Sequence, residues 1–196
     1  MREVRLLLLL LTVSMLSACA KNIELIKSMS TSTRDNVFQE SVGEAAIPSG
    51  YAHLNILVSL KTHKAGLYPF EKKAHGTADY MLLLNIDGQA THIRGELTVE
   101  DSAGFSRDAE AGEGIRYNFK KGVRLKAGRH RITVAIPDDE VVFVGDIVLS
   151  EGSTNVLVLE PVYGRMQGKQ RPGFYGRTSF TQGIDGFKAF LNGRAL

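Results

Sequence analysis

Residues 51–60 read Tyr51-Ala52-His53-Leu54-Asn55-Ile56-Leu57-Val58-Ser59-Leu60. From Leu54 to Leu60 a large apolar residue occupies every second position. Side chains at alternate positions of an extended chain point to the same face, whereas a helix repeats its apolar positions every three to four residues. The stretch therefore predicts a β-strand with one face buried.

Further strands of this character follow along the chain. The expected ranges are 80–86, 92–99, 115–119, 132–136, 141–149 and 156–159. Turn-forming residues separate them, among which Asp87-Gly88 is typical of a tight hairpin. No long stretch of helical periodicity interrupts this series. The pattern predicts an all-β fold, a small antiparallel β-sandwich.

The N-terminus has a different character. Arg2 and Arg5 flank the start of an apolar run of about eleven residues (6–16), well short of the roughly 20 that a membrane-spanning helix needs. The run ends in Leu16-Ser17-Ala18-Cys19, which resembles the lipobox of bacterial lipoprotein precursors. The resemblance implies that residues 1–18 are a cleaved signal helix. It also implies that Cys19 is lipidated with palmitate-type acyl chains and becomes the first residue of the mature protein.

The same residues predict a cellular location. Two or three acyl chains make membrane attachment long-lived, whereas one holds only marginally. Ala20 and Lys21 follow Cys19, where Asp is the familiar inner-membrane retention signal of many Gram-negative bacteria. We therefore expect a lipid-anchored protein of the cell envelope, at the outer membrane and facing the periplasm or the surface. Cys19 is the only cysteine, so no disulfide within the chain can help to hold an exported domain together.

The expected organisation has four parts. Residues 1–18 are the signal peptide, 19–50 the lipidated N-terminus and polar tether, 51–163 the β-sandwich, and 164–196 a Gly-rich, basic extension that packs on the sandwich. As a flexible coil of about 30 residues, the tether would reach about 30 Å. Near the C-terminus, Asn192-Gly193 follows an apolar stretch and favours a hairpin.

The second half of the sandwich region resembles a known family. Residues 123–134 and the later stretch 149–159, with Asn85-Ile86-Asp87-Gly88 before them, look like a PEGA-type surface-layer domain, in which a Leu-x-x-Gly-x-His element opens a strand. The signature that names that family is replaced here by Gln-Ala-Thr-His at 89–92. The resemblance implies a small immunoglobulin-like sandwich in an envelope context. Independently, His130 is expected to bond a neighbouring backbone group and fix the turn before it.

The sequence contains few candidates for chemistry. Metallopeptidase, paired-cysteine, serine-hydrolase and phosphate-loop motifs are missing from it. Neutral imidazoles are common transition-metal ligands, and the candidates are His53, His63, His75 and His92, which lack the spacing of a metal motif. Carboxylates suited to calcium are Asp101, Asp108, Glu110 and Glu113, whose spacing is not that of an EF-hand. We therefore predict no catalytic residue, no metal and no cofactor.

Two function classes remain open. The preferred one is a non-catalytic envelope lipoprotein whose sandwich binds or spaces a protein, glycan or lipid. The alternative is a carbohydrate- or metal-dependent enzyme with a shallow site in its loops. A net charge of +3 is too weak to indicate a nucleic-acid partner, and none is expected.

Overall fold

The computed structural model describes residues 22–41, 46–66, 73–102, 108–165 and 177–196, and in these ranges the chain is built almost entirely of strands. Within the described ranges, one α-helix is present, at residues 22–29. The strands are β1 (Phe38–Glu40), β2 (Tyr51–Thr62), β3 (Met81–Ile86), β4 (Gln89–Arg94), β5 (Glu96–Ser102), β6 (Gly112–Lys126), β7 (Gly128–Ile136), β8 (Val141–Leu149), β9 (Thr154–Tyr163), β10 (Ile184–Leu191) and β11 (Arg194–Ala195). Two short 3₁₀ turns complete the list, η1 (Pro137–Asp139) and η2 (Phe180–Gln182).

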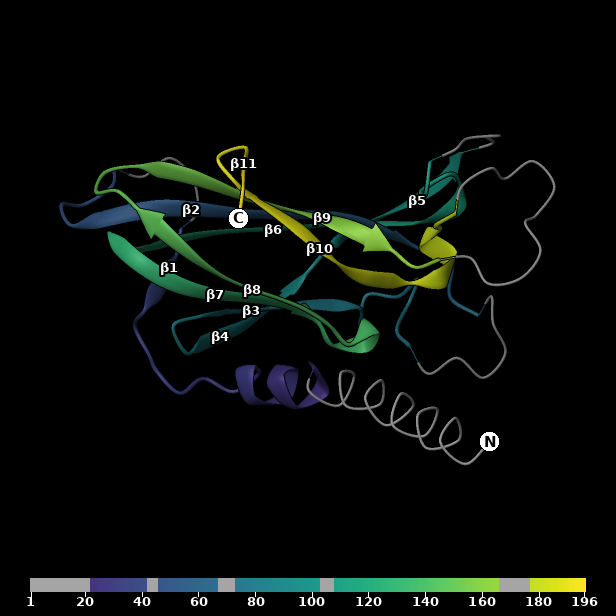
Figure 1. Cartoon of the computed structure of the whole chain (residues 1–196), viewed down its shortest axis with the longest axis horizontal. Coiled ribbons are helices and arrows are strands. Elements are labelled where there is room, and N and C mark those ends of the chain that lie inside the picture. The colour runs from purple at the N-terminus through teal and green to yellow at the C-terminus, as the bar shows by residue number, and fades with distance from the viewer. Residues whose placement is uncertain (1–21, 42–45, 67–72, 103–107, 166–176) are drawn as a thin grey trace, which may run out of the picture.

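The strands form two sheets that pack face to face, so the predicted all-β sandwich is confirmed (Figure 1). The seven-stranded sheet has the order β1-β6-β2-β9-β10-β11, with β5 pairing along another part of β6. The four-stranded sheet has the order β4-β3-β7-β8. All pairs are antiparallel except β2–β9, which run parallel. The helix lies on the outer side of the four-stranded sheet (Figure 1).

The core lies between the two sheets and follows from the alternation in the sequence. Leu54, Ile56 and Leu60 of β2 are at most 1 % exposed, whereas Ser59 between them is exposed. From the other sheet Leu82 and Leu84 of β3 join the same cluster, with no exposed surface. Burial of this alternating apolar face supplies the main driving force for the fold.

Two predicted hairpins are confirmed, and one predicted strand is wrong. Asp87-Gly88 joins β3 to β4 and Asn192-Gly193 joins β10 to β11, with both residues of each turn at positive φ as a type I′ turn requires. The strand expected at 92–99 instead divides at Gly95 into β4 and β5, which belong to different sheets. A Cβ on Gly95 would lie 3.1 Å from the Phe119 ring, which is closer than most side chains pack, so the glycine lets the chain pass near the ring.

The expected domain boundaries also need correction. Residues 22–29 are helical and 38–40 form β1, so much of the stretch expected to be a tether belongs to the folded body. At the other end, β10 pairs with β9 over Ile184–Leu191, so the seven-stranded sheet continues beyond residue 163. Part of the C-terminal extension is therefore a strand of the sandwich itself.

Candidate functional site

Cys19 lies outside the described residues, but the chain from Asn22 onward is held on the four-stranded sheet. Ile26 of the helix is 7 % exposed and packs against Leu83 and Ala135. At the start of the helix, the Asn22 side-chain Nδ2 donates to the Glu140 carbonyl at 3.2 Å. An isolated helix of this length is marginal in water, so contact with the sheet holds it in place.

The stretch after the helix is tied to the β3–β4 hairpin. The Thr33 backbone N–H donates to the Gly88 carbonyl at 2.8 Å. The Gln89 side-chain Oε1 accepts from two successive backbone N–H groups, those of Val37 at 2.7 Å and Phe38 at 3.0 Å. The segment 22–40 therefore follows the sandwich surface from the helix to β1.

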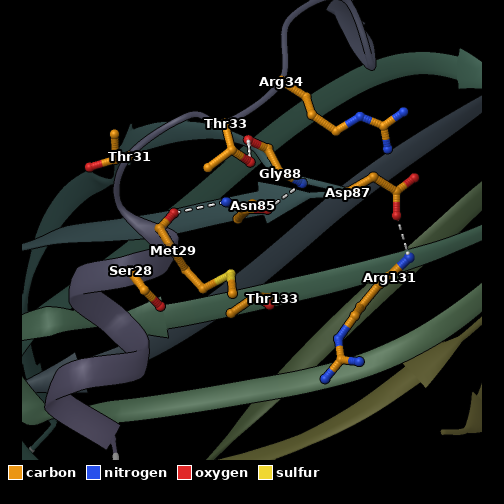
Figure 2. Close-up of a pocket in the computed structure, with 10 residues that line it drawn as sticks. All are labelled: Ser28, Met29, Thr31, Thr33, Arg34, Asn85, Asp87, Gly88, Arg131 and Thr133. Carbon is orange, nitrogen blue, oxygen red and sulfur yellow. Dashed lines mark hydrogen bonds between the residues drawn. The ribbon is translucent and has the colours of Figure 1, made fainter.

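A cavity of about 320 Å³ lies between this segment and the four-stranded sheet (Figure 2). Hydroxyls and other polar groups line it, from Ser28, Thr31 and Thr33 on one side and from Asn85, Asp87 and Thr133 on the other. Figure 2 shows Asn85 bridging the two sides, because its Nδ2 donates to the Met29 carbonyl at 2.8 Å while its Oδ1 accepts from the Gly88 N–H at 2.9 Å. The sequence analysis missed this pocket, because its two walls are distant in the chain.

Charged groups border the same pocket. Asp87 accepts from the Arg131 backbone N–H at 2.8 Å and from His130 Nδ1 at 2.7 Å. His130 Nε2 lies 2.7 Å from the Lys126 carbonyl, so the prediction that His130 bonds a nearby backbone group is confirmed. Within the described ranges, the guanidinium groups of Arg34 and Arg131 make no hydrogen bond or ion pair. Two arginines and one aspartate thus border the pocket.

The opposite end of the four-stranded sheet contains a buried chain of polar side chains. His63 Nε2 lies 2.9 Å from His75 Nδ1, and His75 Nε2 lies 2.9 Å from Asp139 Oδ1. The Tyr80 hydroxyl donates to Asp139 Oδ2 at 2.7 Å, and Lys73 Nζ lies 2.9 Å from Asp139 Oδ1. His63 and His75 are 2 % and 3 % exposed, and the Asp139 side chain is 1 % exposed.

These contacts change how the acidic groups titrate. Burial disfavours a charged carboxylate, but the hydrogen bond and charge interaction with His75, aided by Tyr80 and Lys73, outweigh it and lower the pKa of Asp139 to about 2. Burial and the adjacent Asp139 raise the pKa of the Tyr80 hydroxyl. Asp139 is therefore an anion that accepts several hydrogen bonds inside the fold.

The four candidate metal-ligand histidines do not converge. Only His63 and His75 meet, and the remaining ring nitrogen of His63 lies 3.0 Å from the Lys64 carbonyl. His53 is at the other end of β2, with Nε2 3.0 Å from the Ser41 hydroxyl, and His92 is exposed on β4. In the described part of the chain, no group of three or more His, Cys, Asp or Glu side chains is arranged to hold a metal ion.

The candidate calcium carboxylates each face a different partner. Glu110 lies 2.6 Å from Arg116 Nη1 and accepts from the Tyr163 hydroxyl at 2.5 Å. Glu113 pairs with Lys64, and Asp108 Oδ1 accepts from the Glu110 N–H at 3.1 Å. The backbone of Asp101 pairs with Glu113 in the β5–β6 ladder, and residues 103–107 lie outside the described ranges.

A lysine that the sequence analysis missed lies at the centre of this acidic region. Lys61 is 1 % exposed, and its Nζ donates to the Gly112 carbonyl at 2.6 Å and lies 3.3 Å from Glu100 Oε2. Its Nζ also lies 5.0 Å from the centroid of the Phe180 ring. The hydrogen bond from Arg116, together with Lys61, lowers the pKa of Glu100 against the effect of burial. Such a network stabilises one arrangement of the loops rather than offering open ligand positions.

The chain matches no known protein family, no characterised protein and no solved structure. The likeness to PEGA-type domains therefore stays a prediction. Across the described ranges, no helix combines the length and apolarity required to cross a bilayer.

Proposed function

We propose that this chain is a bacterial envelope lipoprotein, anchored by acyl chains on Cys19, whose β-sandwich has a non-catalytic binding or structural role. The membrane is its constant partner, and an envelope protein, a glycan or a lipid is the second. The proposed location is the outer membrane, on the side of the periplasm or the surface.

The lipobox at residues 16–19 carries this proposal. The arginines before it, the short apolar run and the cysteine form one ordered pattern, and each element has a separate role in export and lipidation. The folded body begins directly after this pattern, because the helix at 22–29 starts three residues beyond Cys19. Acyl chains on Cys19 would therefore hold the folded domain close to the membrane.

The arrangement of the buried polar groups favours a non-catalytic role. A catalytic Asp–His pair must reach a substrate, whereas His75 and the Asp139 carboxylate are almost fully covered. The carboxylates of Glu100, Glu110 and Glu113 face lysine or arginine side chains. These groups therefore bind one another and hold the loops in place.

Lipidation is tested by expressing the full chain in a Gram-negative host beside a Cys19→Ser variant. We expect the parent to fractionate with membranes and its N-terminal peptide to begin at Cys19 with the mass of an acylated cysteine. The variant should lack both properties. A parent with a free Cys19 thiol, or with residues 1–18 still attached, would refute the proposal.

The binding role is tested on the same lipidated protein. Crosslinking in native membranes, followed by mass spectrometry of the captured material, should give one stable protein, glycan or lipid partner. Turnover of a glycan or an ester by the purified parent, lost on His75→Ala substitution, would instead support the enzymatic alternative.

A further inference from the structure

Two residues separate the proposed lipid attachment at Cys19 from Asn22, the first described residue, so three Cα–Cα steps join them. A fully extended chain spans at most about 3.6 Å per residue, so these two Cα atoms are no more than about 11 Å apart. The lipid attachment must therefore lie close to the place where Asn22 meets the sandwich.

That place belongs to the four-stranded sheet. Asn22 donates to the Glu140 carbonyl just after η1, and Ile26 one turn later is buried against Leu83 and Ala135. At the far end of the helix, the Met29 carbonyl accepts from Asn85. The helix is thus tied to this sheet at both ends and in the middle (Figure 2 shows the Met29 end).

The outer face of the seven-stranded sheet is on the other side of the molecule. Packed sheets lie about 10 Å apart, and a helix axis lies a further 10 Å or so above the sheet that it covers. The helix axis and the seven-stranded sheet are therefore separated by about 20 Å, which exceeds the reach of the link from Cys19.

Exposed groups on the helix-covered side suit a membrane surface. Ile23 on the helix is 46 % exposed, and Val148 on the outer face of β8 is 68 % exposed. The side chains of Arg34 and Arg131 lie on the same side, at the pocket. Apolar side chains interspersed with arginines match the apolar and anionic groups of a bilayer surface.

From this geometry we infer that the helix-covered side of the sandwich, formed by residues 22–29 and the outer face of the four-stranded sheet, lies against the bilayer, while the outer face of the seven-stranded sheet points away from it. The inference rests on the proposed lipidation of Cys19. A docked helix replaces the flexible tether, so covalent geometry sets the orientation of the domain.

Two neighbouring positions test this orientation. Val148 on β8 and Thr154 on β9 are exposed, β-branched residues on either side of one turn, at the same end of the sandwich. Their chain neighbours Leu149 and Asn155 are buried, so Val148 and Thr154 point outward from opposite sheets. Because acylation consumes the thiol of Cys19, Val148→Cys or Thr154→Cys provides the only free thiol in the full-length protein.

Each variant is purified with its lipid, labelled with an environment-sensitive fluorophore and placed in vesicles of phosphatidylethanolamine and phosphatidylglycerol. We expect lipids with a nitroxide headgroup to quench the label at 148 several-fold more than the label at 154, and aqueous iodide to show the reverse. Equal lipid quenching at both positions, or more at 154, would overturn the inference. Protection of position 148 from both quenchers would mean that a second copy covers this side, and would also overturn it.

Mass spectrometry of the same samples separates the two proposals. An acylated Cys19 with equal quenching refutes the orientation alone. A Cys19 without acyl chains removes the anchor and refutes both. Urea unfolding of the two labelled variants checks that each retains the stability of the parent.

Discussion

Replacing Asp139 with Asn should remove a pH-dependent contribution to stability that can be calculated from the structure. The carboxyl has a pKa of about 2 in the folded chain and an ordinary value of 3.8. Since the folded value is the lower one, the contribution is fully present above pH 4 and is lost as the pH falls towards 2. At 1.36 kcal/mol per pKa unit, the difference corresponds to about 2 kcal/mol.

The variant should therefore unfold with a free energy about 2 kcal/mol below that of the parent at pH 7. The neutral amide is a poorer acceptor for His75, Tyr80 and Lys73, and its NH₂ group replaces one of the two oxygens that accept their hydrogen bonds. Near pH 2 the parent also loses the charge, so the gap between the two proteins should close by most of that amount.

Urea titrations at pH 7, 5, 3 and 2, followed by circular dichroism, measure this gap on a protein that begins at residue 20. Asp138→Asn is the matched control, because burial and the adjacent Asp139 raise the pKa of the Asp138 carboxyl. A group whose folded pKa is raised favours unfolding above that pKa, so the control should lose no stability at pH 7. A gap for Asp139→Asn that is constant across the pH range would refute the reasoning.

Three other substitutions probe separate contacts. Tyr163→Phe removes the hydroxyl that accepts from the buried Lys61 N–H and donates to the Glu110 carboxylate. The free energy of unfolding in urea should fall by about 1–3 kcal/mol, and no change would mean that water replaces the hydroxyl. Ile26→Ala should speed hydrogen exchange across residues 22–37, whereas Ile23→Ala at the exposed position should not; equal exchange in both would refute the docking of the helix. Gly114→Ala places a Cβ 2.6 Å from the Thr62 backbone oxygen and should lower the free energy of unfolding, measured by thermal unfolding, by about 1–3 kcal/mol. The control Gly186→Ala, whose Cβ would meet no heavy atom within 4 Å, should change it by no more than about 0.5 kcal/mol. A Gly114 variant as stable as the parent would show that the loops move apart freely.

The sandwich could be predicted from the sequence because its signals are local. Alternation of apolar residues sets which face of each strand is buried, and a dipeptide such as Asp87-Gly88 adopts its turn from its own backbone preferences. The division at Gly95 could not be predicted in this way. It depends on a close approach to Phe119, a residue of another strand, and a glycine within a strand pattern is compatible with several local structures.

The candidate sites were harder to predict because their partners are far apart in sequence. His63 and His75 are twelve residues apart and meet Asp139 from a third segment, with a separation of 64 residues between His75 and Asp139. Lys61 continues an apolar strand, and only the fold brings Glu100 and Phe180 to it. Composition indicated which residue types could act as ligands, but which partner each side chain faces is a property of tertiary packing.

The helix at residues 22–29 shows how such packing changes the expected behaviour of the anchored protein. The polar Ser/Thr residues at 30–33 that follow it suggest a tether, and an isolated helix of this length gains too little from its own hydrogen bonds to persist. Ile26 reverses that balance, since burying an isoleucine side chain is worth about 1.5–3 kcal/mol. With the helix docked, a lipid on Cys19 would hold the domain at the bilayer instead of letting it move within a radius of about 30 Å. An envelope partner would then meet the outer face of the seven-stranded sheet first, because the other side would already be against the membrane.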